Sequence, residues 1–241
     1  MPPAQAAPPR KARPAAISGA GLRVFGRLLK RADGGRLDQG PDFYAPAVLQ
    51  DSAAGRVLLW GWSWEARPQE DTDRAGWSGV LTAPRVTGVR PDGRLSMTPA
   101  PELERLRAQV PFTADGRLPV ALPDAYELLI TATGPAAVGL LRSADGRRVA
   151  LVLDPAAGTV MLDRAGRPRT RGSRPSILRA DVAPDRPLAV RLLVDGSLFE
   201  LFADGGAATE RIYRRPGDVP ELTVAGAAHV TGWEPALPKH G

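Results

Sequence analysis

One short stretch of the sequence, residues 40–65, combines aromatic rings with carboxylates. It reads GPDFYAPAVLQDSAAGRVLLWGWSWE and holds an acidic-aromatic tetrad, Asp42 to Ala45, then three tryptophans and a final glutamate. Aromatic residues make up only 5% of the chain, so their concentration here is unusual. Flat rings stack on the apolar faces of sugar rings, and a carboxylate can accept a pair of sugar hydroxyls. The stretch therefore indicates either a carbohydrate-binding surface or a well-packed corner of a β-sheet.

Other catalytic chemistries find little support in the residue types present. The chain has no cysteine, which excludes disulfides, thiolate metal sites and a cysteine nucleophile. Its two histidines, His229 and His240, both lie near the C-terminus, which argues against a histidine-rich metal centre. There is no Gly-x-Ser-x-Gly elbow for a serine hydrolase, and the glycine-rich run at 19–26 has the wrong spacing for a nucleotide-binding loop. We therefore expect no metal and no cofactor.

The chain is basic, with a formal net charge of +6 and a pI of about 10.4. Nearly all of the basic residues are arginines scattered through hairpins rather than clustered on one helix, which disfavours nucleic acid as a partner. The densest basic run, residues 166–176, is expected to be a solvated loop. No stretch approaches the ~18 apolar residues that span a bilayer, and the Pro/Ala/Arg-rich start lacks the apolar segment of a secretion signal. The sequence thus predicts no membrane partner, a disordered tail over residues 1–18 and a cytoplasmic location.

Turn signals indicate that short antiparallel strands carry these residues. Asp-Gly occurs six times, and between apolar runs it is a strong hairpin signal because both residues tolerate positive φ. The clearest case, residues 190–213, reads as three strands joined by two such turns, and alternation along the strand places Glu200 on the solvent face. One helix is predicted over residues 101–109, where prolines mark a domain junction. We predict four parts: a tail over 1–18, a first β domain over 19–98, a linker with the short helix over 99–110, and a second β domain over 111–233.

Four segments, in order along the chain, resemble one known family. They are DFYAP (Asp42 to Pro46), GRVLLWGW followed by Glu65, GWSGVLTAPR with DGRLSMTPAPELERLR, and VRLLVDGSLFELFADGGAATERIY. Together they resemble glycoside hydrolase family 32, which comprises invertases, levanases, inulinases and sucrose-6-phosphate hydrolases. The resemblance implies an all-β fold, with the last one to two blades of a five-bladed β-propeller over 19–98 and a C-terminal β-sandwich over 111–233. It implies retaining hydrolysis of β-fructosidic bonds in sucrose or fructans as the family activity.

The chemistry of that family needs two carboxyl groups, an Asp nucleophile and a Glu acid/base, roughly 5–5.5 Å apart. The family motifs for its catalytic residues, an Asn-Asp-Pro run, an Arg-Asp-Pro run and a Glu-Cys run, are absent from this sequence. Only 41 residues precede Asp42, fewer than the roughly 50 of one propeller blade. We therefore expect no catalytic residue in this chain and no activity from the chain alone.

Three hypotheses follow from the missing motifs. The first is a truncated β-fructofuranosidase-type hydrolase that has lost its catalytic residues. The second is a non-catalytic β-sandwich module that binds fructan or interacts with a partner subunit. In the third, a separate polypeptide supplies the missing propeller blades. In each case a partial propeller should expose unpaired strand edges and apolar faces.

The resemblance places a sugar-binding pocket beside the Asp42 tetrad and the strand that follows it. For Trp60 the alternative is burial between strands, and for Asp42 it is the capping of a turn. Asp42 and Glu65 are not expected to replace the catalytic pair, because an open site would leave little to separate their pKa values. Trp64 and Trp77 are expected to pack against the sheet. The predicted substrate-binding residues are Asp42, Tyr44, Trp60, Trp62 and Glu65.

Overall fold

The computed structural model describes residues 22–24, 27–29, 36–90, 93–114, 116, 118–167, 176–181, 183 and 186–236. The chain divides into two compact units, residues 1–35 and 36–241. The first contains a two-stranded antiparallel sheet, β1 (Leu22–Val24) with β2 (Arg27–Leu29), and all other elements belong to the second. The predicted tail over 1–18 lies outside the described residues. The predicted domain boundaries near residues 98 and 111 fall inside the second unit, and the division into two domains there stays a prediction.

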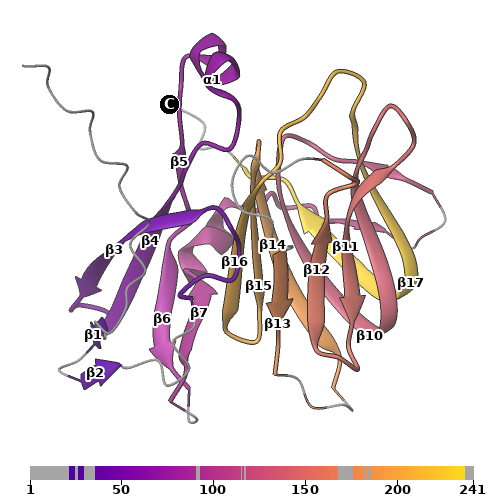
Figure 1. The fold of residues 1–241 in the computed structure, drawn as a ribbon. Helices are drawn as coiled ribbons and strands as arrows, with labels where there is room; N and C mark the ends of the chain where they lie inside the picture. The colour runs from indigo at the N-terminus through magenta and orange to yellow at the C-terminus, as the bar shows by residue number, and fades with distance from the viewer. Residues whose placement is uncertain are drawn as a thin grey trace, which may run out of the picture. The chain divides into compact units, whose positions relative to one another are not determined.

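The second unit begins with an antiparallel sheet that we call the blade sheet. Its strands follow the order β3-β4-β6-β7, and the two-residue β5 pairs with the end of β4. A four-stranded up-and-down sheet is the unit from which propellers are built, in agreement with the predicted all-β fold (Figure 1). Its strands are β3 (Phe43–Asp51), β4 (Arg56–Ser63), β5 (Val80–Leu81), β6 (Arg85–Val89) and β7 (Leu95–Pro99).

Two short helices accompany this sheet. The helix α1 (Gln69–Ala75) lies between β4 and β5 and ends at Gly76, whose φ of 72° is the left-handed conformation that glycine favours. The helix predicted over residues 101–109 is instead a 3-10 helix, η1 (Pro101–Leu106). It ends three residues earlier than predicted because the backbone becomes extended at Arg107. No helix in the described part of the chain has the length and the apolar character needed to cross a membrane.

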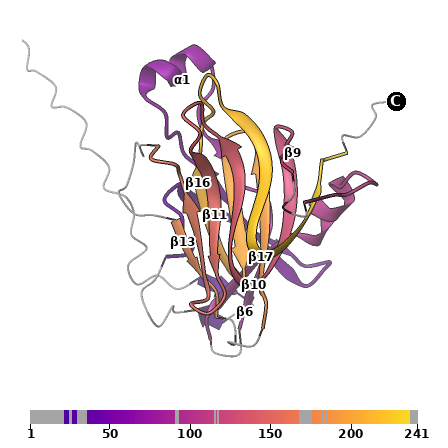
Figure 2. The same cartoon turned by 90° about the vertical axis from the view of Figure 1, so that its right-hand side faces the viewer.

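A β-sandwich follows, built around the long strand β10 (Ala125–Arg142). The first half of β10 pairs with β14 and the second half with β11, while β17 pairs with both halves on the other side. The register of β10 against β17 shifts between Ala132 and Ala136, which is where a strand can bend and pass from one layer to the other. Figure 2 looks onto β10, β11 and β17. The other strands are β8 (Phe112–Ala114), β9 (Val120–Ala121), β11 (Arg148–Asp154), β12 (Thr159–Asp163), β13 (Ser176–Arg179), β14 (Leu188–Asp195), β15 (Leu198–Ala203), β16 (Gly206–Arg211) and β17 (Val219–Trp233).

The core of the sandwich lies between its two layers, which continue as β14-β15-β16 and as β11-β12-β13. Leu128, Leu151 and Leu192, one from each of three neighbouring strands, are completely buried in it. The predicted turns at Asp145-Gly146, Asp195-Gly196 and Asp204-Gly205 are confirmed, because each joins two consecutive antiparallel strands and its glycine has positive φ. Short-range turn chemistry therefore sets the order of these strands.

The segment of residues 38–42, which we call the clasp, runs along the outer edge of β16. Asp42 donates its backbone N–H to the Thr209 carbonyl at 3.2 Å. The Asp38 carboxylate accepts the Thr209 N–H at 2.8 Å, and the Asp42 carboxylate accepts the Arg211 N–H at 2.7 Å. Two aspartate side chains thus accept the N–H groups at the edge of β16, in place of the backbone carbonyls of a regular β-ladder.

The clasp also leaves no room for a larger residue at its centre. A Cβ added to Gly40 would lie 2.1 Å from the Thr209 carbonyl oxygen. Next to it, Gln39 donates its N–H to the Ala207 carbonyl at 2.8 Å, and its side-chain oxygen accepts the N–H of Arg179 at 3.1 Å. Because Arg179 ends β13, the clasp connects the outer strands of the two sandwich layers.

A buried ion network joins the clasp, the blade sheet and the sandwich. Arg85, at the start of β6, is completely buried. Its guanidinium donates to the Asp38 carboxylate at 2.7 Å, to the Glu200 carboxylate at 2.7 Å and to the Thr209 hydroxyl at 2.6 Å. The aromatic rings of Phe43 and Phe202 lie within 4.8 and 5.1 Å of the same guanidinium, which provides cation–π contacts.

The prediction that Glu200 faces solvent is wrong. Alternation does place Glu200 opposite to the sandwich core, but the blade sheet covers that face of β15, and Glu200 is only 2% exposed. Burial raises the pKa of Glu200, and the Arg85 charge opposes this shift. Around the network, a small apolar cluster of Leu59, Met97, Phe202 and Ala207 excludes water from the same interface.

Replacing Arg85 with methionine should lower the free energy of unfolding by about 3–5 kcal/mol, because Asp38 and Glu200 would stay buried without their counter-charge. Urea unfolding of the wild type and of Arg85→Met at pH 7 measures this loss. The matched control is Arg94→Met, since the ion pair of Arg94 with Asp181 is 49% and 62% exposed and should contribute under ~1 kcal/mol. Equal losses in the two variants would contradict a special role for the buried network.

Candidate functional site

The strand β3 carries a bulge in the middle of the DFYAP motif. Tyr44 pairs with Trp62 across the sheet, whereas the next pair is Ala47 with Trp60. The extra residue on β3 is accommodated by Ala45, which has a φ of 43° in the left-handed region. A bulge and a strained non-glycine residue together change the direction of a strand, and both occur frequently beside functional sites.

Beside this bulge the blade sheet exposes aromatic rings. Tyr44 is 40% exposed although one face of its ring stacks on Trp64, with 4.8 Å between centroids and 19° between planes. Trp62 is 48% exposed, and a Cβ on Gly79 would lie 2.0 Å from its indole nitrogen, so only glycine fits beside it. Trp60 is half-buried on the same face of β4. These rings form an open surface on one face of the blade sheet.

Phe43 and Asp42 lie on the inner side of the same stretch. A Cβ on Gly61 would lie 2.1 Å from the Phe43 ring, so Phe43 fills the interface with the sandwich. Asp42 is 3% exposed and its carboxylate is used by the Arg211 N–H. Burial raises the pKa of Asp42 to about 6, and the nearby Glu210 charge adds to the shift while the Arg211 hydrogen bond opposes it.

Glu65 lies at the other end of the predicted site and accepts an unusual number of hydrogen bonds. Arg67 donates to it from Nε at 2.9 Å and from Nη2 at 2.8 Å, and the backbone N–H groups of Ala66 and Arg67 donate at 3.0 and 3.1 Å. The Tyr213 hydroxyl also donates to this carboxylate. Burial alone would raise the pKa of Glu65, but the bonds from Arg67 and Tyr213 outweigh it and lower the pKa to about 2.

The residues that hold Glu65 were not predicted from the sequence. Arg67 lies over the rings of Trp77 and Tyr213, at 4.2 and 4.9 Å from their centroids. Burial and the bond to Glu65 raise the pKa of Tyr213 to about 12. Arg67 could have been suspected as a basic residue two positions after Glu65. Tyr213 follows β16 in the sandwich and gives no local signal of its proximity.

The reason given for excluding Asp42 and Glu65 as a catalytic pair, that little would separate their pKa values, is wrong. Their environments do separate their pKa values, to about 6 and about 2. Such a separation can define an acid and a base. Asp42, however, is 3% exposed, and the Glu65 carboxylate is occupied by Arg67 and Tyr213. Both carboxylates are therefore engaged by partners within the chain.

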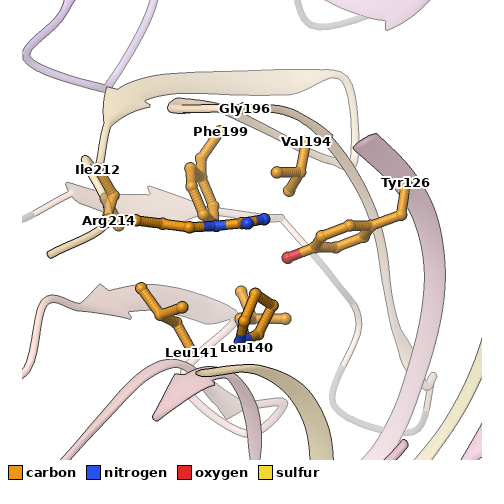
Figure 3. A pocket seen from close by; sticks show the side chains of 9 residues that line it. Tyr126, Leu140, Leu141, Val194, Gly196, Phe199, Ile212 and Arg214 are labelled. Atoms are coloured by element: carbon orange, nitrogen blue, oxygen red, sulfur yellow. The ribbon is translucent and has the colours of Figure 1, made fainter. Parts of the chain in front are cut away.

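Two other kinds of site find no support in the described part of the chain. No group of three or more His, Cys, Asp and Glu side chains there could hold a metal ion. A small cavity of about 10 Å³ lies in the sandwich, where the Tyr126 hydroxyl points toward the Arg214 guanidinium (Figure 3). That volume holds about one water molecule and no sugar. The candidate site is thus the open aromatic surface of the blade sheet.

Family models match most of the chain. Residues 23–99 match the model described as "Glycosyl hydrolases family 32 N-terminal domain", and residues 107–231 match "Glycosyl hydrolases family 32 C terminal". The second match alone covers more than half of the sequence, in the region of the sandwich. The chain belongs to glycoside hydrolase family 32, as the resemblance indicated.

Similar proteins include a sucrose-6-phosphate hydrolase of Zymomonas mobilis subsp. mobilis, 28% identical over 193 residues, which are 73% of this chain and 36% of that protein. An insoluble β-fructofuranosidase isoenzyme of Arabidopsis thaliana is 41% identical over 73 residues, 30% of this chain and 13% of that protein. The chain thus spans well under half the length of these curated relatives.

Solved structures share the fold. The sucrose-6-phosphate hydrolase from Lactobacillus gasseri has a TM-score of 0.67 and 19% identity, with 83% of this chain and 43% of that chain covered. Fructan 1-exohydrolase IIa from Cichorium intybus, solved in complex with 1-kestose, has a TM-score of 0.64 and 21% identity over 83% and 49% of the two chains. At these identities the likeness supports the fold and carries no residue assignment.

The raised pKa of Asp42 makes a prediction about stability and pH. Because the folded chain holds the proton more tightly than the unfolded chain does, the contribution of this group is fully present below pH 3.8 and is lost as pH rises through about 6. A shift of about two units corresponds to on the order of 3 kcal/mol. Relative to wild type, Asp42→Asn should therefore gain about this much unfolding free energy between pH 4 and pH 7.

Urea unfolding across that pH range measures the difference, and Asp42→Ala separates charge from hydrogen bonding. The asparagine oxygen can still accept the Arg211 N–H, whereas alanine leaves this N–H unpartnered at a cost of about 1–3 kcal/mol. We expect both variants to show the same pH trend relative to wild type, with Asp42→Ala lower throughout. A difference between Asp42→Asn and wild type that stays constant with pH would contradict the raised pKa.

Proposed function

We propose that this chain is part of a β-fructofuranosidase-type hydrolase and binds β-fructosides, such as sucrose or a fructan, on the surface between Asp42 and Glu65. The observation that carries the proposal is the exposure of Tyr44 and Trp62, at 40% and 48%, on the blade sheet of a family 32 chain. Tyr44 rests on Trp64, so its outer face is held flat. Flat, supported rings favour stacking on sugars because little side-chain freedom is lost on binding.

We also propose that residues 1–241 alone do not hydrolyse the fructosidic bond. Retaining hydrolysis needs one carboxylate free to attack and one carboxylic acid free to donate a proton, roughly 5–5.5 Å apart. The family motifs for these groups are absent from the sequence. The two carboxylates of the predicted site are already occupied, Asp42 by the Arg211 N–H and Glu65 by Arg67 and Tyr213.

A separate polypeptide that completes the propeller is the partner that this proposal includes. Among the described strands, β3 pairs only with β4, so its outer edge offers unpaired N–H and C=O groups. Its side chains are exposed along most of its length, Val48 at 51% and Leu49 at 53%. An apolar strand with these properties could be covered by a neighbouring propeller blade.

The alternative, a sandwich that acts alone as a binding module, is not favoured. The outer faces of β15 and β16 are buried under the blade sheet and the clasp, and all six residues of β15 are buried. Without the blade sheet, Glu200 would lose its partner Arg85. The sandwich is therefore half of a joint structure.

The proposal is tested with the purified full chain and two probes, sucrose and 1-kestose. We expect no release of fructose above the buffer blank, and binding of 1-kestose that Tyr44→Ala weakens by about fivefold through the loss of the stacking ring. Calorimetry and intrinsic fluorescence measure the binding. Val89→Ala is the matched control, since Val89 is an apolar residue of the same sheet with 47% exposure, and its cross-strand partner is Leu95 rather than a residue of the proposed site.

Two results would contradict the proposal separately. Release of fructose by the wild type that disappears in the double variant Asp42→Asn, Glu65→Gln would show that the chain is a competent enzyme. Absence of binding to both sugars at millimolar concentration would remove the carbohydrate site. Release that persists in the double variant contradicts the proposed inactivity in the same way and assigns the catalytic role to other residues of the chain.

A further inference from the structure

Trp77, which the sequence assigned to packing, is an exposed aromatic ring with a charged support. Its side chain lies just after α1 and is 45% exposed. The Arg67 guanidinium lies over the ring at 4.2 Å from the centroid, and so covers one face. Nearly half of the indole surface nevertheless stays open to solvent. A ring that only fills a core would not be open to this extent.

The support beneath Trp77 is rigid. Arg67 is held by two hydrogen bonds to Glu65, at 2.9 and 2.8 Å, and by a third to the Trp77 carbonyl oxygen at 3.0 Å. The Arg67 side chain is 13% exposed and that of Glu65 is 12% exposed. Because Glu65 balances the charge of Arg67, the stack presents little net charge to a neutral ligand.

The sandwich contributes to the same support. The Tyr213 hydroxyl donates to Glu65, and the Tyr213 ring lies 4.9 Å from the Arg67 guanidinium. The buried Arg211 guanidinium is more distant, 5.6 Å from the Trp77 ring centroid and 5.1 Å from that of Tyr213. Residues from two sheets thus converge on one indole, which fixes its orientation before any ligand arrives.

From this geometry we propose that Trp77 is an additional stacking position for a sugar ring, adjacent to the predicted site and used by fructosides longer than a disaccharide. The inference rests on the proposed function, since it extends the same surface through Glu65. The chemistry of the patch favours a sugar over a protein partner. It is one partly exposed aromatic ring bordered by charged groups, which matches the apolar face and hydroxyl rim of a sugar ring, whereas a protein interface needs a larger continuous apolar area.

The test compares 1-kestose with sucrose on the full chain. Trp77→Ala should weaken the binding of 1-kestose by about tenfold and leave that of sucrose within twofold. Trp77→Phe, which keeps a flat ring, should retain 1-kestose affinity within about threefold of wild type. Tyr44→Ala serves as the comparison within the predicted site and should weaken both sugars. Urea unfolding midpoints confirm that each variant is folded.

Each of the other possible results contradicts one particular part of the proposal. If Trp77→Ala leaves both sugars unchanged while Tyr44→Ala weakens both, the Trp77 position is overturned and the proposed function stands. Equal weakening of both sugars by Trp77→Ala overturns the assignment to longer fructosides. If the wild type binds neither sugar at millimolar concentration, the proposed function and this inference are both overturned. A loss with Trp77→Phe as large as with Trp77→Ala overturns stacking as the mechanism.

Discussion

The rest of this structure depends on the buried ion pairs that Arg85 forms with Asp38 and Glu200. Removing ions from water is costly, and a well-packed apolar replacement of such a group can be more stable. What the ions supply here is position. Arg85 is the first residue of β6, Asp38 is the first residue of the clasp, and Glu200 lies on β15. Their hydrogen bonds therefore fix the positions of the blade sheet, the clasp and the sandwich relative to one another. Apolar contacts around them could slide, whereas these directional bonds cannot.

The geometry of the candidate site depends on these contacts between the clasp, the blade sheet and the sandwich. Because the clasp follows the edge of β16 as far as Asp42, the chain enters β3 at a fixed point, just before Tyr44 and the bulge at Ala45. Asp42 therefore belongs to the frame of the site, and its buried carboxylate is engaged by the sandwich. Tyr44 and Trp62 are the parts of the motif that face solvent. A motif that reads as one binding unit thus divides into an inner structural half and an outer exposed half.

The sequence predicted what depends on neighbouring residues and failed where distant residues meet. Asp-Gly turns, such as that at residues 204–205, follow from local backbone preferences and were placed correctly. Glu200 was placed in solvent because alternation along one strand cannot reveal that another sheet covers its outer face. The support of Glu65 by Tyr213 joins residues 148 positions apart, and no pattern in the sequence indicates it. The family resemblance gave the fold, which periodicity alone left as a sandwich or a barrel.

The contribution of the sandwich to the aromatic surface gives a physical reason why the two sheets remain together in this chain. The sandwich fixes Asp42 through the Arg211 N–H and Glu65 through the Tyr213 hydroxyl, one at each end of the predicted site. A change in the sandwich near β16 would therefore move both carboxylates and the rings between them. A blade sheet without this support would keep its aromatic residues but lose the partners that hold Asp42 and Glu65 in place. The surface is thus a property of the joint between the sheets rather than of the blade sheet alone.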